Sequence, residues 1–335
     1  MTEKKILLTH GSGGRMTRDL LEKIIVPILD NPALNRMEDS SLLSEIGARM
    51  VMTTDSYVVK PLFFPGGDIG KLAVCGTVND LATAGAKPIA LSVSVIIEEG
   101  FSFDDLKKIL YSLKQTADSI PVPLITGDTK VVERGRGDGI YITTTGVGCV
   151  PDKVHLSPER IEPGDAVVIN GPIGSHEASI ICARNDFLLG ADVRSDCAPL
   201  HTLMKAVLEA VPDARCARDA TRGGVVSVLT ELIESSGFGI ILDEEKIPIE
   251  KSVQSICEIL GIDPLLMANE GKMIIIVPEN KAELCLEAME RVSEKGKSSI
   301  IGRVHDGHAR LTIQTPYGTS RVVTMPMGTQ LPRIC

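Results

Sequence analysis

The chain has 335 residues, which is enough for two domains of ordinary size, each with its own hydrophobic core. It carries 35 lysines and arginines against 44 aspartates and glutamates, and the resulting net charge of −9 argues against non-specific binding to nucleic acid or to an anionic membrane. Tryptophan is absent and aromatic residues make up 3% of the chain, so we expect no stacking platform for single-stranded nucleic acid.

The eight cysteines are scattered and form no Cys-x-x-Cys pair, which indicates free thiols in a reducing cytoplasm and no thiolate zinc site. The first five residues lack the apolar region of a signal peptide, and no apolar run approaches membrane-spanning length. We therefore predict a cytoplasmic protein that does not associate with membranes.

A glycine-rich loop at residues 10–15 precedes an amphipathic run over residues 16–29. Glycine lets backbone N–H groups approach an anion closely, and a helix N-terminus adds partial positive charge, so phosphate is the expected ligand. A flexible N-terminal turn explains the pattern equally well, and no Walker A signature follows. A second glycine-rich turn, at residues 170–175, also leads into a helix. The candidate phosphate-binding residues of the two loops are Gly11, Gly13, Gly14 and Asn170.

Alternating strands and helices are predicted along the first half of the chain, which is typical of a mixed α/β fold. Ser102 and Asp105 have the spacing of a helix capping box. The expected strands cover residues 49–54, 90–97, 124–127 and 139–148, and the expected helices cover residues 69–84 and 103–118.

Three aspartates are delivered by separate elements of this half: Asp55 by the end of a strand, Asp80 by a helix, and Asp128 by a polar turn. Carboxylates of this kind suit a hard cation such as Mg²⁺, whose remaining ligands are water and phosphate oxygens. Each aspartate alone is more simply explained as a turn former or a cap. Together they favour a Mg²⁺–nucleotide site, in which Asn79 is a further cofactor contact. Lys130 either neutralises a transferring phosphoryl group or is a solvated loop lysine.

Residues 150–164 are rich in proline and charge and resemble a linker, so we place a domain boundary near residue 155. The second half continues the alternation and ends in three short strands between residues 300 and 324. Its expected strands include residues 166–169, 239–242 and 272–277, and its expected helices cover residues 225–236, 251–260 and 280–295.

Two acidic residues of the second half lie in polar turns beside glycine. Asp219, in the run Arg218-Asp-Ala-Thr-Arg-Gly-Gly224, is either a fourth metal ligand or a helix N-cap. Glu270 lies directly before a predicted strand, where local backbone geometry could hold it near a ligand. Turn composition alone favours a surface position for it.

The chain ends in Pro332-Arg-Ile-Cys335. The neighbouring α-carboxylate disfavours the thiolate of Cys335, so a reactive thiol there needs a receptive pocket or a cation, for which Arg333 is a candidate. Prolines and a glycine break regular structure in this tail, while Leu331 and Ile334 are apolar anchors for a groove. A frayed tail with an incidental cysteine is the plainer interpretation of these residues alone.

Taken together, the motifs resemble the HypE family of hydrogenase maturation factors. That family belongs to a larger group with aminoimidazole ribonucleotide synthetase, selenophosphate synthetase and thiamine monophosphate kinase. The resemblance spans almost the whole chain, and the terminal tetrapeptide singles out HypE within the group. Ser175-His-Glu177 departs from the family pattern, which has a glycine after the histidine. The matching internal motifs are His10-Gly-Ser-Gly-Gly14, Val78-Asn-Asp-Leu-Ala82, Gly127-Asp-Thr-Lys130, Arg218-Asp-Ala-Thr-Arg-Gly-Gly224 and Asn269-Glu-Gly-Lys272.

The resemblance implies an α/β (α+β) synthetase-like fold of two domains and a tail. Residues 1–155 would bind ATP and dimerise through a mixed sheet, residues 156–325 would form an α/β sandwich, and residues 326–335 would carry the modified cysteine. It also implies a homodimer that holds ATP between its subunits. A carbamoyltransferase, HypF, would load a carbamoyl group on Cys335. The chain would dehydrate this group to a thiocyanate, and a HypC–HypD complex would receive the nitrile as the cyanide ligand of [NiFe] hydrogenase.

Once that substrate is granted, the chemistry requires a phosphorylated carboxamide oxygen and the loss of N–H protons. Glu270 is the candidate base, and Mg²⁺ with Lys130 is the candidate source of positive charge. The metal or phosphate would be organised by Asp55, Asp80, Asp128 and Asp219. Two alternatives stay open: a small-molecule kinase or synthetase that does not need Cys335, and an adaptor whose C-terminal peptide is bound by a partner.

Overall fold

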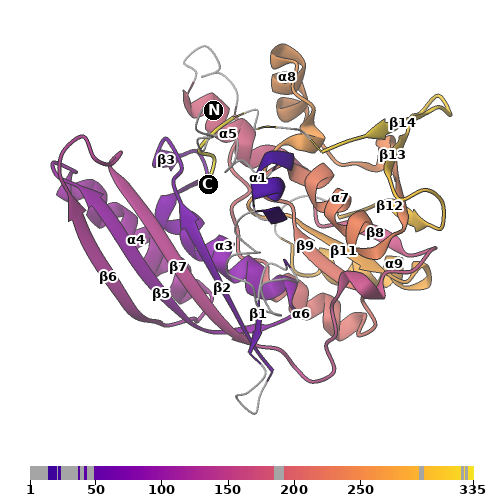
Figure 1. The fold of residues 1–335 in the computed structure, drawn as a ribbon, viewed down its shortest axis with the longest axis horizontal. Helices are drawn as coiled ribbons and strands as arrows, with labels where there is room; N and C mark the ends of the chain where they lie inside the picture. Colours follow the sequence, from indigo (N-terminus) through magenta and orange to yellow (C-terminus); the bar gives the residue numbers. More distant parts are fainter. Residues whose placement is uncertain are drawn as a thin grey trace.

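The computed structural model describes residues 14–20, 22–23, 37, 41–43, 49–184, 192–293, 298–325, 328 and 331–335. One β-sheet from each half of the chain forms the frame of the molecule, and helices pack on both sheets (Figure 1). The predicted mixed α/β class is therefore confirmed.

The N-terminal sheet has five strands in the order β1-β2-β7-β5-β6. β7 pairs antiparallel with β2 and with β5, whereas β5 and β6 are parallel. Alternate residues of β7 are buried, so one face of this sheet belongs to the core. The strands of this half are β1 (Ser41–Leu43), β2 (Met50–Tyr57), β5 (Lys87–Glu98), β6 (Leu124–Val132) and β7 (Ile140–Cys149), with a separate hairpin of β3 (Phe63–Phe64) and β4 (Gly67–Asp68).

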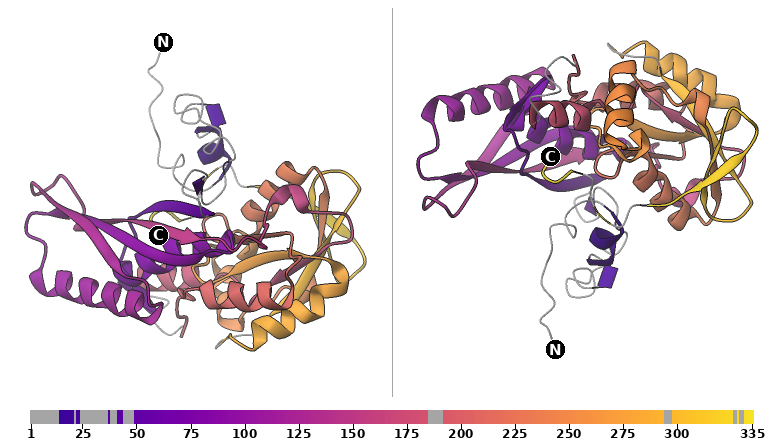
Figure 2. Two further views of the ribbon diagram at one scale, coloured as in Figure 1. Left: turned by 90° about the horizontal axis from the view of Figure 1, so that it is seen from below. Right: turned by 90° about the horizontal axis from the view of Figure 1, so that it is seen from above.

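Two helices, α3 (Ile69–Thr83) and α4 (Phe103–Ser119), lie on one face of this sheet (Figures 1 and 2). The carboxylate of Asp68 caps α3, and the hydroxyl of Ser102 accepts from the Asp105 N–H at the start of α4. No helix of the described residues covers the opposite face of the sheet (Figure 1).

The C-terminal sheet has seven strands in the order β14-β13-β10-β12-β8-β11-β9. Its interior strand β8 pairs antiparallel with both β12 and β11. The strands are β8 (Ala166–Ile169), β9 (Cys216–Asp219), β10 (Gly239–Asp243), β11 (Met273–Val277), β12 (Ser299–His305), β13 (Leu311–Gln314) and β14 (Ser320–Val323).

Every residue of β8 and β11 is buried, because helices cover both faces of the sheet. On one face, Val167 and Ile274 pack with the apolar side of α7 (Gly224–Ser236). On the other, Val168 and Ile275 pack with α6 (His201–Ala210) and α9 (Ala282–Glu290). The remaining helices are α1 (Arg15–Leu20), α5 (Ser175–Arg184) and α8 (Lys251–Leu260).

The helix α3 joins the two halves. It packs on the N-terminal sheet and also contacts β9 and α6, and nearly all its residues are buried, including Thr77 and Asn79. Because a helix that is buried on all sides has no face toward water, its apolar residues need not gather on one side of the helix. Residues at its C-terminal end therefore lie at the junction of the two sheets.

Two expected strand ends are wrong, and one helix was not predicted. β6 does not end before Asp128, because it stays paired with β5 as far as Val132. β2 continues past Asp55 to Tyr57 for the same reason, through its pairing with β7. The helix α6 is not among the predicted elements, although Leu203 and Val207 form its buried face at helical spacing.

None of the helices in the part of the chain that the structure describes is long and apolar enough to cross a membrane.

Candidate active site

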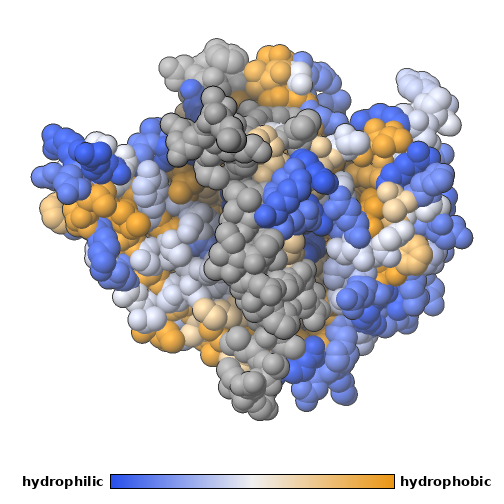
Figure 3. Space-filling view, viewed as in Figure 1, coloured by the Kyte–Doolittle hydropathy of each residue, from blue (hydrophilic) through white to orange (hydrophobic). Residues whose placement is uncertain are grey.

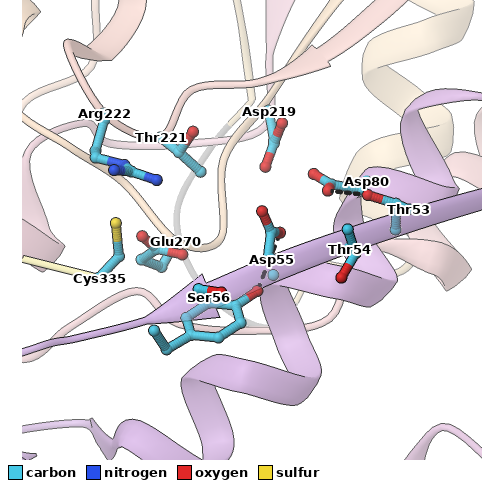
Figure 4. A pocket seen from close by; sticks show the side chains of 12 residues that line it. Thr53, Thr54, Asp55, Ser56, Asp80, Asp219, Thr221, Arg222, Glu270 and Cys335 are labelled. Carbon is cyan, nitrogen blue, oxygen red and sulfur yellow. Dashed lines mark hydrogen bonds between the residues drawn. The ribbon is translucent and has the colours of Figure 1, made fainter. Parts of the chain in front are cut away.

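A cavity of about 210 Å³ lies where the two sheets meet, and its wall is strongly polar. The wall is built from β2, α3, the turn after β9, the loop before β11 and the end of the chain (Figure 4). Its lining residues are Thr53, Thr54, Asp55, Ser56, Tyr57, Gly76, Asp80, Asp219, Thr221, Arg222, Glu270 and Cys335.

Three of the four predicted metal ligands line this cavity together. Asp55 comes from β2, Asp80 from the last turn of α3, and Asp219 from the end of β9. The Thr53 hydroxyl donates to Asp80 Oδ2 at 2.7 Å, and the Tyr57 hydroxyl donates to Asp55 Oδ2 at 3.2 Å. Neighbouring hydroxyls thus fix the carboxylates that face the cavity.

The turn between β9 and α7 directs Arg222 into the cavity. It ends in Gly223 and Gly224, both at positive φ, of 75° and 61°. A side chain is strained at such angles, and a Cβ on Gly224 would also approach the carbonyl oxygens of Leu265 and Met267. The two glycines let the chain reverse within two residues, so that Asp219 and Arg222 face the same space.

Glu270 is 3% exposed and is held by its backbone rather than by its carboxylate. Its N–H donates to Asp196 Oδ1 at 3.1 Å, and its carbonyl oxygen accepts from Asn79 Nδ2 at 3.3 Å and from the Ala198 N–H at 3.3 Å. Its Oε1 atom is buried without a hydrogen-bond partner among the described residues. This arrangement leaves a fixed carboxylate with an oxygen available to a ligand.

Burial raises the pKa of Glu270 well above its ordinary value, and the nearby carboxylates of Asp219 and Asp196 raise it further. The Arg222 guanidinium acts in the opposite direction. Cationic charge brought into the cavity would likewise lower this pKa and favour the carboxylate, the form that can accept a proton.

The end of the chain lies inside the cavity, and Cys335 is 8% exposed. The Val58 N–H donates to a carboxylate oxygen of Cys335 at 3.1 Å, and the Lys60 N–H donates to the Arg333 carbonyl oxygen at 3.0 Å. Ile334 is buried in the same apolar cluster as Cys335, and Leu331 packs against it, as the predicted groove requires.

Burial raises the pKa of the Cys335 thiol to about 12, although the charge of Arg222 acts to lower it. Figure 4 shows the sulfur beside Arg222 and Glu270. The proposed cation Arg333 does not serve the thiol, because its guanidinium donates to the Val58 carbonyl oxygen at 2.9 Å and pairs with Asp138. Arg222, which keeps contact with solvent through the cavity, is the cation at the thiol.

Asp128 and Lys130 do not line the cavity of their own chain. They lie on the edge strand β6, are exposed, and pair with each other at 2.8 Å. β7 and β5 separate β6 from β2, so three strand spacings, or roughly 14 Å, lie between β6 and the strand that carries Asp55. The sheet register places both residues on the uncovered face.

Two asparagines proposed as cofactor contacts hold the protein's own backbone. Asn79 Oδ1 accepts from the Leu200 N–H at 2.8 Å. Asn170 donates to the Gly271 carbonyl oxygen at 3.0 Å and accepts from the Met273 N–H at 2.7 Å. Gly14 is buried directly before α1, and the Gly11 and Gly13 predictions lie outside the described residues.

The donor set fits a magnesium ion on chemical grounds. Asp55, Asp80 and Asp219 bring negative charge into one confined cavity, and carboxylate oxygens are the ligands of hard cations. In the described residues no three acidic, histidine or cysteine side chains lie close enough to enclose an ion. Magnesium commonly uses one or two carboxylates together with phosphate and water, so this arrangement suits an ion that arrives with a nucleotide.

Sequence reasoning gave no role to Arg222 and considered His176 only as a titrating or phosphate-binding residue, whereas in the structure Arg222 lies at the Cys335 thiol and His176 contacts the tail. A signal for Arg222 was present, since it shares the glycine-ended turn of Asp219. His176 carried no comparable signal, because a histidine at the start of a helix is commonly incidental.

Comparisons with known proteins show the family of this chain. Residues 37–150 match the family described as AIR synthase related protein, N-terminal domain, and residues 162–314 match its C-terminal domain. A carbamoyl dehydratase HypE from Azotobacter vinelandii is 48% identical, over 98% of this chain and 96% of the relative.

Two solved structures are similarly close. A chain in a HypE–HypF complex is 46% identical, with a TM-score of 0.87 over 92% of this chain and 99% of that chain. A HypE structure in complex with ATP is 40% identical, with a TM-score of 0.83 over 99% of this chain and 100% of that chain. This identity extends over nearly the full length, so the chain belongs to the HypE family of carbamoyl dehydratases.

Proposed function

We propose that this protein converts an S-carbamoyl group on Cys335 to a thiocyanate in an ATP-dependent dehydration, and so supplies the cyanide ligand of [NiFe] hydrogenase. The observation that carries the proposal is the position of the Cys335 thiol, inside a cavity that also holds Glu270, Arg222 and three aspartates. A small-molecule kinase would not need its own chain end in this cavity. An adaptor would need that chain end exposed.

The reaction joins two steps. The carboxamide oxygen attacks the γ-phosphorus of ATP, ADP departs, and one N–H proton is lost to give an O-phosphoryl imidate. The C–O bond then breaks, phosphate leaves with its electron pair, and the second nitrogen proton is removed as S–C≡N forms. Glu270 is the base for a nitrogen proton, since its buried carboxylate lies beside the sulfur that carries the group.

Arg222 supplies positive charge where the carboxamide oxygen and the phosphoryl group would meet. Asp55, Asp80 and Asp219 would hold a magnesium ion with the nucleotide, and the ion would neutralise phosphate charge. Ile334 and Cys335 are buried, so on the tail side of the cavity the protein would shield an activated imidate from water.

Loading of the thiol requires a different position of the tail. With a pKa of about 12, the buried Cys335 is almost entirely protonated at neutral pH and is a weak nucleophile. The carbamoyl group would therefore be attached with the tail outside, where a carbamoyltransferase of the HypF type can reach it. The same outward position would present the thiocyanate to a HypC–HypD acceptor.

A homodimer would complete the site. On the uncovered face of the N-terminal sheet, Met52 and Ile96 are 42% and 41% exposed, and Figure 3 shows apolar and weakly polar side chains on this side of the molecule. Two such faces packed together would bury this surface. Asp128 and Lys130 lie on the same face, from which they could reach the cavity of the partner subunit.

The direct test of the function is mass spectrometry of the peptide that contains Cys335, first after loading by the carbamoylating partner and then after the loaded protein has been separated and given Mg²⁺–ATP. We expect a carbamoyl adduct on this cysteine that loses one water when Mg²⁺–ATP is added. Cys149, a half-buried cysteine elsewhere in the chain, is the internal control and should stay unmodified. An adduct that never loses water would contradict the proposal.

Mixed dimers test the intersubunit role of Asp128. We expect Asp128→Ala and Glu270→Gln homodimers to be inactive, and the mixed dimer of the two variants to recover about half of the wild-type rate. It would contain one intact cavity, formed by Glu270 of one subunit and the partner's Asp128. The control is the mixed dimer of Asp80→Ala and Glu270→Gln, which shares no intact cavity and should stay inactive. Equal inactivity of both mixed dimers would place Asp128 in its own chain's site, and an active Asp128→Ala homodimer would place it outside the reaction.

A further inference from the structure

The last residues of the chain are held by both halves of the protein. On the N-terminal side, the segment after β2 donates two backbone N–H groups, one to the carbonyl oxygen of Arg333 and one to a carboxylate oxygen of Cys335. On the C-terminal side, Arg184 Nη2 donates to the Arg333 carbonyl oxygen at 2.7 Å, and His176 Nε2 lies 2.6 Å from the Ile334 carbonyl oxygen. Each of the last three residues therefore has a main-chain oxygen with a protein donor.

The backbone at Arg333 shows how specific this position is. Its φ is +58°, in the left-handed region that a residue with a side chain adopts only when its surroundings hold it there. The contacts of its guanidinium with Val58 and Asp138 fix this residue. The turn it makes points the next carbonyl group, that of Ile334, at His176.

The tautomer of His176 follows from its neighbours. The Ile334 carbonyl oxygen, 2.6 Å from Nε2, can only accept, so Nε2 carries a hydrogen. Ser195 Oγ accepts from the Cys197 N–H at 3.1 Å and keeps its own hydrogen for His176 Nδ1, 2.8 Å away. Nδ1 is then an acceptor, and the single ring hydrogen of a neutral imidazole lies on Nε2. Nε2–H donates to the Ile334 carbonyl oxygen.

The ring is fully buried, which keeps it neutral: desolvation lowers the pKa of His176 below its ordinary value. Phe64 packs against it edge to face, with ring centroids 5.4 Å apart. The ring therefore has one orientation, one tautomer and one acceptor in the tail.

The loop that sets this tautomer also sets the position of the base. Ser195 and Cys197 flank Asp196, whose Oδ1 accepts from the Glu270 N–H and whose Oδ2 pairs with Lys272 Nζ at 3.2 Å. The Ser195 N–H donates to the Pro65 carbonyl oxygen at 2.7 Å, which ties the loop to the N-terminal half. A short chain of hydrogen bonds thus connects the tail to Glu270, the residue proposed to remove a nitrogen proton from the group on Cys335.

We propose that His176 is a positioning residue for the dehydration: through Nε2–H it seats the Ile334 carbonyl group, and through Ser195 and the 195–197 loop it fixes the Cys335 sulfur relative to Glu270. His176 does not exchange a proton with the substrate. It holds the tail in its inward position, so that Cys335 is aligned with Glu270.

The experiment compares His176→Ala with His176→Gln, whose amide N–H can replace the Nε2 donor. The first readout is the rate of Cys335 alkylation by iodoacetamide, followed by peptide mass spectrometry, without partner or nucleotide. We expect His176→Ala to raise this rate roughly threefold to tenfold, the change that one net hydrogen bond makes in an equilibrium constant. His176→Gln should restore most of the protection. His155→Ala, at an exposed histidine, is the control and should match wild type.

The second readout is the dehydration rate of carbamoyl-loaded protein, and it alone rests on the proposed function. It should fall in His176→Ala by at least the alkylation factor, with ATP affinity unchanged, and recover in His176→Gln. Ser195→Ala, which removes the hydrogen bond that selects the tautomer, should shift both readouts in the same direction by a smaller factor. If His176→Ala does not fold, Ser195→Ala is the variant that tests the proposal.

Alkylation at the wild-type rate in His176→Ala and Ser195→Ala would overturn the proposal, as would equal behaviour of the folded Ala and Gln variants. If the wild-type protein fails to dehydrate its carbamoyl group while the alkylation pattern holds, the proposed function fails and the seating role of His176 stands.

Discussion

Replacement of Glu270 by Gln is expected to lower the dehydration rate about 10²- to 10⁴-fold, the usual contribution of a positioned general base. Gln keeps the size of the side chain but cannot accept the nitrogen proton. The backbone bonds to Asp196 and Asn79 do not involve the carboxylate and should survive, so the fold and the ATP affinity should stay near wild type. S-carbamoyl protein should therefore accumulate, which peptide mass spectrometry of Cys335 measures in single-turnover experiments.

The pH dependence of the same step provides a second measurement. The pKa of Glu270 is raised, so the carboxylate, which is the active form, becomes more abundant as the pH rises. The wild-type rate should increase with pH across this pKa, and Glu270→Gln should lose that rise. Glu258→Gln, at an exposed glutamate of α8, is the control. A wild-type rate in Glu270→Gln would assign the proton to another base or to water.

Arg222→Gln is expected to slow dehydration about 10²- to 10³-fold, the typical cost of removing one preorganised donor to a developing anion. The guanidinium lies beside the Cys335 sulfur, where the proposed reaction would phosphorylate the carboxamide oxygen. Its removal also takes away the cation that lowers the pKa of Glu270, so the rising limb of the pH profile should move to higher pH. Rapid-quench measurement of loaded protein at several pH values tests both effects.

Arg222→Lys is the matched control for this variant. It keeps the charge but loses the planar pair of donors, so we expect a rate between those of wild type and Arg222→Gln, with the pH limb near its wild-type position. If Arg222→Gln leaves both rate and pH limb unchanged, Arg222 is not the source of the positive charge, and the proposed magnesium ion and partner subunit would have to supply it.

Local patterns predicted most of the fold. β8 (Ala166–Ile169) and α8 (Lys251–Leu260) lie where the apolar pattern placed them, because each pattern matches one period and is bounded by turn residues. α6 has apolar residues at helical spacing that were not recognised. The end of β6 could not be found locally, since its pairing with β5 continues through polar residues.

The candidate site was only partly predictable. Asp55, Asp80, Asp219, Glu270 and Cys335 were proposed from sequence, and the structure brings all five to one cavity; their roles stay predictions. Asp128 has the same local signal, but the strand order places it on the far edge of the sheet, and strand order is not a local property. The proposed role of His176 depends on Ser195 and Ile334, two residues distant in sequence that only the folded chain brings together.

The docked tail makes the substrate a tethered ligand. A group joined to its site by a short covalent connection has an effective concentration on the order of millimolar, so even weak docking gives high occupancy. Tighter docking would then be a disadvantage, because it would lower the fraction of time in which donor and acceptor proteins can reach the thiol. The left-handed Arg333 and the buried ring of His176 give geometric specificity without requiring a strong total affinity. Turnover of the whole cycle should therefore pass through a maximum as docking is strengthened. When docking is too weak, misalignment of the tail limits the rate, and when docking is too tight, retention of the product limits it.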